Sequence, residues 1–135
     1  MKPRVVAMVN QKGGVGKTTT AINLGATLAA YERRTLVVDL DPQGNCTTGL
    51  GCEVGADDAT SYDVITGASE LADAVRDTDF PHLAVVPATP DLAGAEVELV
   101  GMVGREFRLR DVIRGVTGRH YVLIDCPPSL GLLTV

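Results

Sequence analysis

The stretch "NQKGGVGKTTT", residues 10–20, has the glycines, lysines and threonines of a phosphate-binding loop. Glycines let a backbone curl so that its N–H groups approach an anion, and a following helix points its positive dipole end at the same place. Lys17 adds a mobile positive charge, the Thr18 hydroxyl can ligate Mg²⁺, and Thr19 can donate one more hydrogen bond. The alternative is a glycine-rich turn in which the Lys-Thr pair is incidental.

The loop departs from the usual pattern at one position. G-x-x-x-x-G-K-[ST] places a glycine at position 11, but this chain has Gln11 there, followed by an additional lysine, Lys12. Lys12 is either a solvated surface lysine or a residue that does something a plain phosphate loop does not do.

Acidic residues follow two other predicted strands. Asp39 and Asp41 come at the end of the strand at 35–40, and Asp125 follows the strand at 120–124. Because the carboxyl ends of parallel strands share one edge, we expect these side chains to lie near the loop. That arrangement suits a phosphate chain with a divalent cation. Each Asp taken alone could instead only cap a turn.

Apolar runs alternate with amphipathic stretches, which predicts βαβ units and a parallel α/β sheet flanked by helices. The strand at 4–9 is nearly continuous in apolar residues and is predicted to be buried on both faces. The other predicted strands are 35–40, 82–87 and 120–124. The predicted helices are 17–31, 61–65, 69–76 with Ser69 as its cap, one starting at Asp91, and one around 109–116. Residues 41–61 are predicted to form a long loop.

Composition and charge narrow the function classes. The chain has 135 residues, enough for one domain, and is 45% hydrophobic. A net charge of -5 argues against DNA binding by bulk charge. The arginines between 105 and 119 could touch DNA phosphates, or could form the solvated face of a helix. Three cysteines without zinc spacing indicate reduced thiols, and no signal peptide or membrane span is predicted, so we expect a cytoplasmic protein.

Three blocks, "QKGGVGKTTT", "LVVDLDPQGN" and "IDCPPSLGLLT", together resemble the ParA/Soj family of partitioning ATPases, which carry the deviant Walker A motif of the ParA/MinD group. The resemblance covers essentially the whole chain and implies a P-loop NTPase-type fold. It implies chromosome or plasmid partitioning, with ATP and Mg²⁺ as cofactors and a nucleoid-associated location. It also implies a homodimer on ATP binding, non-specific DNA binding and stimulation of hydrolysis by a ParB-like protein.

The resemblance also assigns residues. It implies that Lys12 reaches the phosphates of the other subunit, where a cation stabilises the charge that develops in phosphoryl transfer. Asp41 would position or activate the attacking water. The implied catalytic residues are Lys12, Lys17 and Asp41. The implied metal residues are Thr18, Asp39 and Asp125, with Asp125 acting through a bound water. The implied nucleotide-binding residues are Lys12, Gly13, Gly14, Val15, Gly16, Lys17, Thr18 and Thr19. The implied second switch is Pro127, Pro128 and Ser129.

The length of the chain leaves an alternative open. On the resemblance, family members are about twice as long, and a crossover helix predicted from Ser129 has no room to form. Residues 1–135 are therefore expected to be the N-terminal part of a single P-loop ATPase domain, with an incomplete sheet and most of the DNA-binding surface missing. The alternative is a truncated nucleotide-binding module with weak or no activity.

Overall fold

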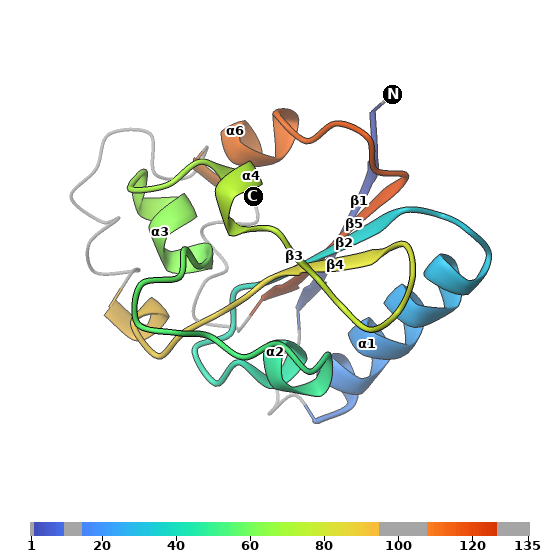
Figure 1. Cartoon of the computed structure of the whole chain (residues 1–135), viewed down its shortest axis with the longest axis horizontal. Coiled ribbons are helices and arrows are strands. Elements are labelled where there is room, and N and C mark those ends of the chain that lie inside the picture. Colours follow the sequence, from blue (N-terminus) through green and yellow to red (C-terminus); the bar gives the residue numbers. More distant parts are fainter. Residues whose placement is uncertain (1, 10–14, 95–107, 127–135) are drawn as a thin grey trace.

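The computed structural model describes residues 2–9, 15–94 and 108–126, which form one sheet with helices on both faces (Figure 1). The strands are β1 (Arg4–Val9), β2 (Thr35–Asp39), β3 (Arg76–Asp77), β4 (Leu83–Val86) and β5 (Tyr121–Cys126). The helices are α1 (Val15–Ala30), α2 (Asn45–Gly49), α3 (Ser61–Thr66), α4 (Leu71–Ala74) and α6 (Arg108–Arg114). The strand order is β1-β5-β2-β4-β3, parallel except for the antiparallel pair β3 and β4. The predicted α/β parallel sheet is confirmed.

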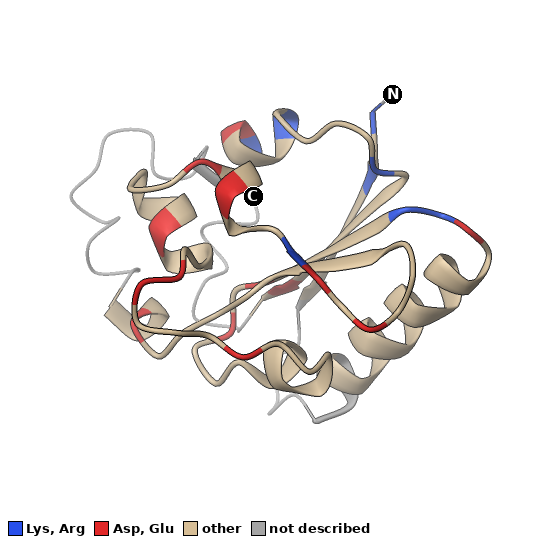
Figure 2. Ribbon diagram, viewed as in Figure 1, with Lys and Arg blue, Asp and Glu red and all other residues tan. Residues whose placement is uncertain are grey.

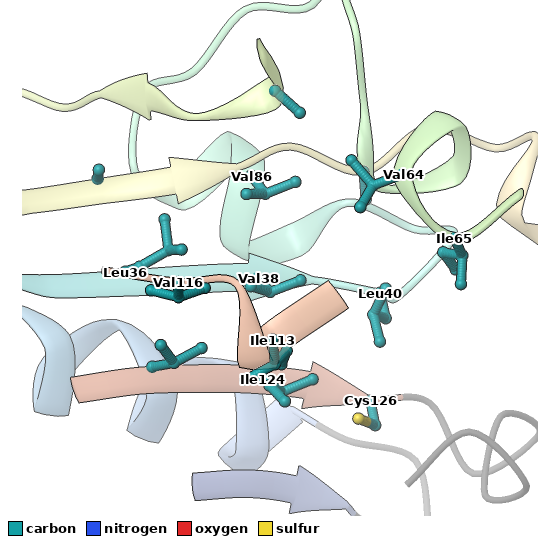
Figure 3. Close-up of a cluster of buried hydrophobic side chains, with 14 of the residues drawn as sticks. Leu36, Val38, Leu40, Val64, Ile65, Val86, Ile113, Val116, Ile124 and Cys126 are labelled. Carbon is teal, nitrogen blue, oxygen red and sulfur yellow. The ribbon is translucent and has the colours of Figure 1, made fainter. Parts of the chain in front are cut away.

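Alternating side chains of the central strands enter two cores. Leu36 and Val38 of β2 pack under α3, α4 and α6, in the cluster drawn in Figure 3. Val37, between them, packs on the opposite face with Ala21 and Ala29 of α1. Because β2, β4 and β5 are covered on both sides, their sequences are mostly apolar, and the polar exceptions include the buried Asp39 and Asp125.

The strand β1 has its predicted bounds, but the prediction that it is buried on both faces was wrong. Val5 is 47% exposed and Val6 is 39% exposed. The reason is position, because β1 pairs with β5 on one side and is an edge strand among the described residues. An apolar run alone does not distinguish a central strand from an edge strand.

Two short elements differ from the prediction at Ser69 and in the 41–61 loop. The helix predicted at 69–76 is shorter, because Arg76 already pairs with Val85 of β4. Glu70, not Ser69, is its N-cap, and the Ser69 hydroxyl donates to the carbonyl of Glu70. The loop contains the helix α2, which the sequence did not predict.

The remaining helix predictions are settled only in part. Residues 92–94 are helical, as expected for a helix starting near Asp91, while its continuation and the helix expected from Ser129 lie outside the described residues. None of the helices in the described ranges has the length and apolarity that a membrane span requires.

Candidate functional site

The predicted phosphate loop lies between β1 and α1, as the motif requires. Lys12, Gly13 and Gly14 fall outside the described residues. Residues 15–17 begin α1, and the structure gives their helical backbone. The described elements on either side of the loop agree with the strand–loop–helix prediction, whereas the contacts of Lys12 and Lys17 stay a prediction.

Thr18 is the first residue of the motif whose side chain is described. It is buried in α1, and its hydroxyl donates to Oδ2 of Asp125 across 3.4 Å. Asp125 is fully buried near the end of β5. The hydrogen bond joins residues separated by 107 positions, and it brings two predicted metal residues together.

Asp39 and Asp125 are register partners on the adjacent central strands β2 and β5. Both are fully buried, and the backbone N–H of Leu40 donates to the carbonyl of Asp125 across 2.9 Å. The predicted convergence of these two acidic residues at one sheet edge is thus what the structure shows.

The Asp39 carboxylate is enclosed by donors. Its Oδ2 accepts from the backbone N–H and the hydroxyl of Thr47, at 2.9 and 2.7 Å, and its Oδ1 accepts from the N–H of Asp41 at 3.1 Å. Burial raises the pKa of Asp39 to about 6, the hydrogen bonds from Thr47 and Asp41 oppose that rise, and the charge of Asp125 adds to it.

The helix α2 supplies the groups that hold both carboxylates. Gly44 begins it in the left-handed region, with φ 66°, which suits glycine. Thr47 then donates to Asp39 and accepts from the N–H of Ala88 at 2.9 Å. The thiol of Cys46 donates to Oδ2 of Asp125 at 3.1 Å. Sequence reasoning missed Cys46 and Thr47, and their only local signal was the glycine in "DPQGN".

Asp41 is half-buried at the start of the turn that leads to α2. Its Oδ1 accepts from the N–H of Gln43 at 2.9 Å, and its carbonyl accepts from the N–H of Gly44 at 2.8 Å. This is the turn-capping geometry that the sequence left open as an alternative. The predicted role in positioning water stays a prediction, as does any role for the exposed Thr19.

The chemistry of the donors fits magnesium at Thr18 and Asp125. Mg²⁺ in nucleotide sites takes one or two protein oxygens and completes its shell with phosphate oxygens and water. A hydroxyl beside a carboxylate meets that need. Asp39 fits a supporting role better, because both of its oxygens already accept hydrogen bonds. Within the described ranges, no three His, Cys, Asp or Glu residues form a cluster that could hold a metal without such help.

The basic residues of the predicted helix near 109–116 lie away from its core-facing side. Ile113 and Val116 are buried, whereas Arg110 and Arg114 are exposed. Figure 2 shows basic residues on α6. The arrangement favours a solvated helix face over a dedicated binding site.

Comparison with known proteins identifies the family. A sequence model described as an AAA domain matches residues 3–135. The chain belongs to this family. A chromosome partitioning protein ParA of Myxococcus xanthus is 55% identical over 133 residues, which cover 98% of this chain and 47% of the relative. The sporulation initiation inhibitor protein Soj of Bacillus subtilis is 50% identical, and the match covers 98% of this chain and 53% of the relative. The predicted ParA/Soj resemblance is confirmed.

A solved structure supports the AAA domain fold. The cobyrinic acid a,c-diamide synthase of Mycobacterium smegmatis, with bound ATP analogue and magnesium, superposes with a TM-score of 0.90 at 45% identity. The match covers 98% of this chain and 54% of that one, so the five-stranded sheet is incomplete relative to it. The chain spans about half the length of the curated relatives it matches.

Proposed function

We propose that this chain binds ATP with Mg²⁺ and hydrolyses it, as the N-terminal part, residues 1–135, of a single partitioning ATPase domain. The observation that carries the proposal is the contact between Thr18 and Asp125. It places the hydroxyl that ends the phosphate-loop motif on a buried carboxylate at the end of β5. Identity of 55% to a protein named for chromosome partitioning supports the cellular role.

In this proposal each residue of the site has a separate role in binding phosphate, magnesium or water. The loop N–H groups and Lys17 bind the phosphates, and Thr18 and Asp125 hold the magnesium ion, Asp125 through a bound water. Asp39 supports that shell, and Asp41 orients the attacking water. The bound magnesium ion supplies charge neutralisation for the phosphates. Asp39 and Asp125 lie near the carboxyl ends of the parallel strands β2 and β5, and Thr18 lies in the helix that follows β1.

In this proposal Lys12 links ATP binding to closure of a dimer. We infer that ATP closes a homodimer in which Lys12 of each subunit reaches the phosphates of the other. The closed dimer then binds DNA without sequence preference, and a ParB-like protein stimulates hydrolysis and release. In this proposal the protein is cytoplasmic and associates with the nucleoid. A cation supplied in trans to a transferring phosphoryl group accelerates hydrolysis by roughly a thousandfold or more.

Substitution of Lys12 tests this proposal in the protein as its source expresses it. Lys12→Ala is expected to retain ATP binding and to lose about a thousandfold or more in partner-stimulated turnover. Lys2→Ala, which removes an exposed lysine outside the motif, is the matched control and should behave as wild type. Full stimulated turnover in Lys12→Ala would exclude the trans role, and absence of ATP binding in the wild type would exclude the proposed function.

The solved neighbour suggests a second function. Its name states synthesis of a diamide, and it is 45% identical to this chain. A nucleotide-binding half could serve an amide-forming enzyme as well as a partitioning one. We favour partitioning because the relatives with that name reach 55% identity. Turnover that required a carboxylic acid and an amide donor, and that DNA and a ParB-like partner left unchanged, would decide for the second function.

A further inference from the structure

Cys46 is fully buried in the first turn of α2, in the core between α1 and the sheet. Its thiol donates to Oδ2 of Asp125 at 3.1 Å. The two residues are 79 positions apart, so the contact exists only in the folded chain. The proposed function gives Asp125 a role but assigns none to this thiol.

The oxygen that Cys46 contacts also accepts from Thr18. The hydroxyl donor comes from α1 at 3.4 Å, and the thiol donor comes from α2. The terminal torsion of an Asp side chain is broad, so a buried carboxylate needs partners to fix its plane. Two donors from different helices on Oδ2 restrict that rotation.

The chemistry of the thiol suits this task. S–H is a weak donor, so it can orient a carboxylate while leaving the negative charge on it. A lysine at the same place would neutralise the charge that attracts a cation. The next residue, Thr47, holds the other buried carboxylate, Asp39, through a hydroxyl bond of 2.7 Å. Neighbouring residues of α2 therefore donate hydrogen bonds to both buried carboxylates.

We propose that Cys46 is a positioning residue for Asp125, and that its thiol hydrogen bond orients the carboxylate for a magnesium-bound nucleoside phosphate. The inference rests on the proposed function for its ligand class. The competing explanation is that Cys46 only fills space in the core of α1, α2 and the sheet. The substitution Cys46→Ser separates these two explanations, because serine keeps a donor of similar size. The substitution Cys46→Ala removes the donor.

The hydrogen bond itself is tested by infrared spectroscopy of the S–H stretch, in the protein as its source expresses it. The difference between wild type and Cys46→Ser assigns the band of Cys46 among the three thiols. Asp125→Asn replaces a charged acceptor with a neutral one, which weakens the bond, so the assigned band should move to higher frequency. A band that stays in place in Asp125→Asn would overturn the proposal.

The positioning role is tested by the affinity for ADP, measured with and without magnesium chloride. Cys46→Ala is expected to lower the magnesium-dependent gain in affinity by about fivefold, the size of one net hydrogen bond. Cys46→Ser should stay within about twofold of wild type, because its hydroxyl replaces the donor. Cys52→Ala, which removes a half-exposed thiol outside the site, is the matched control and should leave the gain unchanged.

The outcomes separate the two proposals. Equal losses in Cys46→Ala and Cys46→Ser, or no loss in either, would overturn the positioning role while leaving the proposed function intact. If the wild type bound no nucleotide with magnesium, the proposed function would fail, and the infrared band would alone decide whether Cys46 orients Asp125.

Discussion

Replacing Thr47 by valine removes one hydroxyl from the centre of the site and keeps the branched shape of the side chain. That hydroxyl donates to Oδ2 of Asp39 at 2.7 Å and accepts from the N–H of Ala88 at 2.9 Å. All three residues are buried, so water cannot replace the lost partner. We expect Thr47→Val to destabilise the protein, and to do so by an amount that depends on pH.

The magnitude follows from the two bonds. An unsatisfied N–H of Ala88 costs about 2 kcal/mol at any pH, and the bond to an ionised carboxylate adds about 2 kcal/mol. Because the pKa of Asp39 is raised to about 6, this side chain is mostly protonated in the folded state at pH 5 and ionised at pH 8. Thr47→Val should therefore lower the free energy of unfolding by about 4 kcal/mol at pH 8 and by about 3 kcal/mol at pH 5, because the bond to the neutral carboxyl is worth about 1 kcal/mol.

Urea unfolding at both pH values, with a chelator and no nucleotide, measures these quantities. Thr47→Ser keeps the hydroxyl and loses only a methyl group, so it should cost about 1 kcal/mol at either pH. If Thr47→Val and Thr47→Ser were equally destabilised, or if the loss in Thr47→Val were the same at pH 5 and pH 8, the hydrogen-bond reasoning would be refuted.

Two further substitutions test neighbouring parts of the site. The pKa of Asp39 is raised from its reference value of 3.8 to about 6 in the folded protein. Between pH 3.8 and pH 6 the folded state therefore binds more protons than the unfolded state, and the free energy of unfolding falls as the pH rises through this range. Asp39→Asn should remove about 3 kcal/mol of this pH dependence in urea titrations, and an unchanged pH profile would contradict the raised pKa. Gly44→Ala forces a residue with a Cβ to φ 66° and should lower stability by about 1 kcal/mol in thermal unfolding, with no loss arguing against the left-handed turn.

The elements that the sequence predicted well are those that local pattern determines. The run Arg4–Val9 has the exact bounds of β1, and the central strand at Thr35 starts where predicted. A parallel sheet places strand ends at one edge, which is why Asp39 and Asp125 could be predicted to meet. Periodicity and topology were sufficient for these features.

The elements that the sequence did not predict depend on distant partners. The helix α2 (Asn45–Gly49) has no apolar period, and it is fixed by bonds from Cys46 and Thr47 to Asp125 and Ala88, which come much later in the chain. The exposure of Val5 likewise depends on which strand lies beside β1, and no local pattern encodes a neighbour. Such contacts form only in the folded chain, so a local sequence pattern does not predict them.

The two buried acids lie side by side, an arrangement that a bound cation would stabilise. Asp39 and Asp125 are register partners without access to water, and the charge of Asp125 adds to the rise that burial causes in the pKa of Asp39. A fold that only needed stability would place apolar residues at two adjacent central positions, because burying like charges side by side is unfavourable. A divalent cation beside Thr18 would reverse this balance, since it lowers the pKa of nearby carboxyls. Binding of magnesium nucleotide should therefore raise the free energy of unfolding of the wild type more at pH 8, where Asp39 is ionised, than at pH 5.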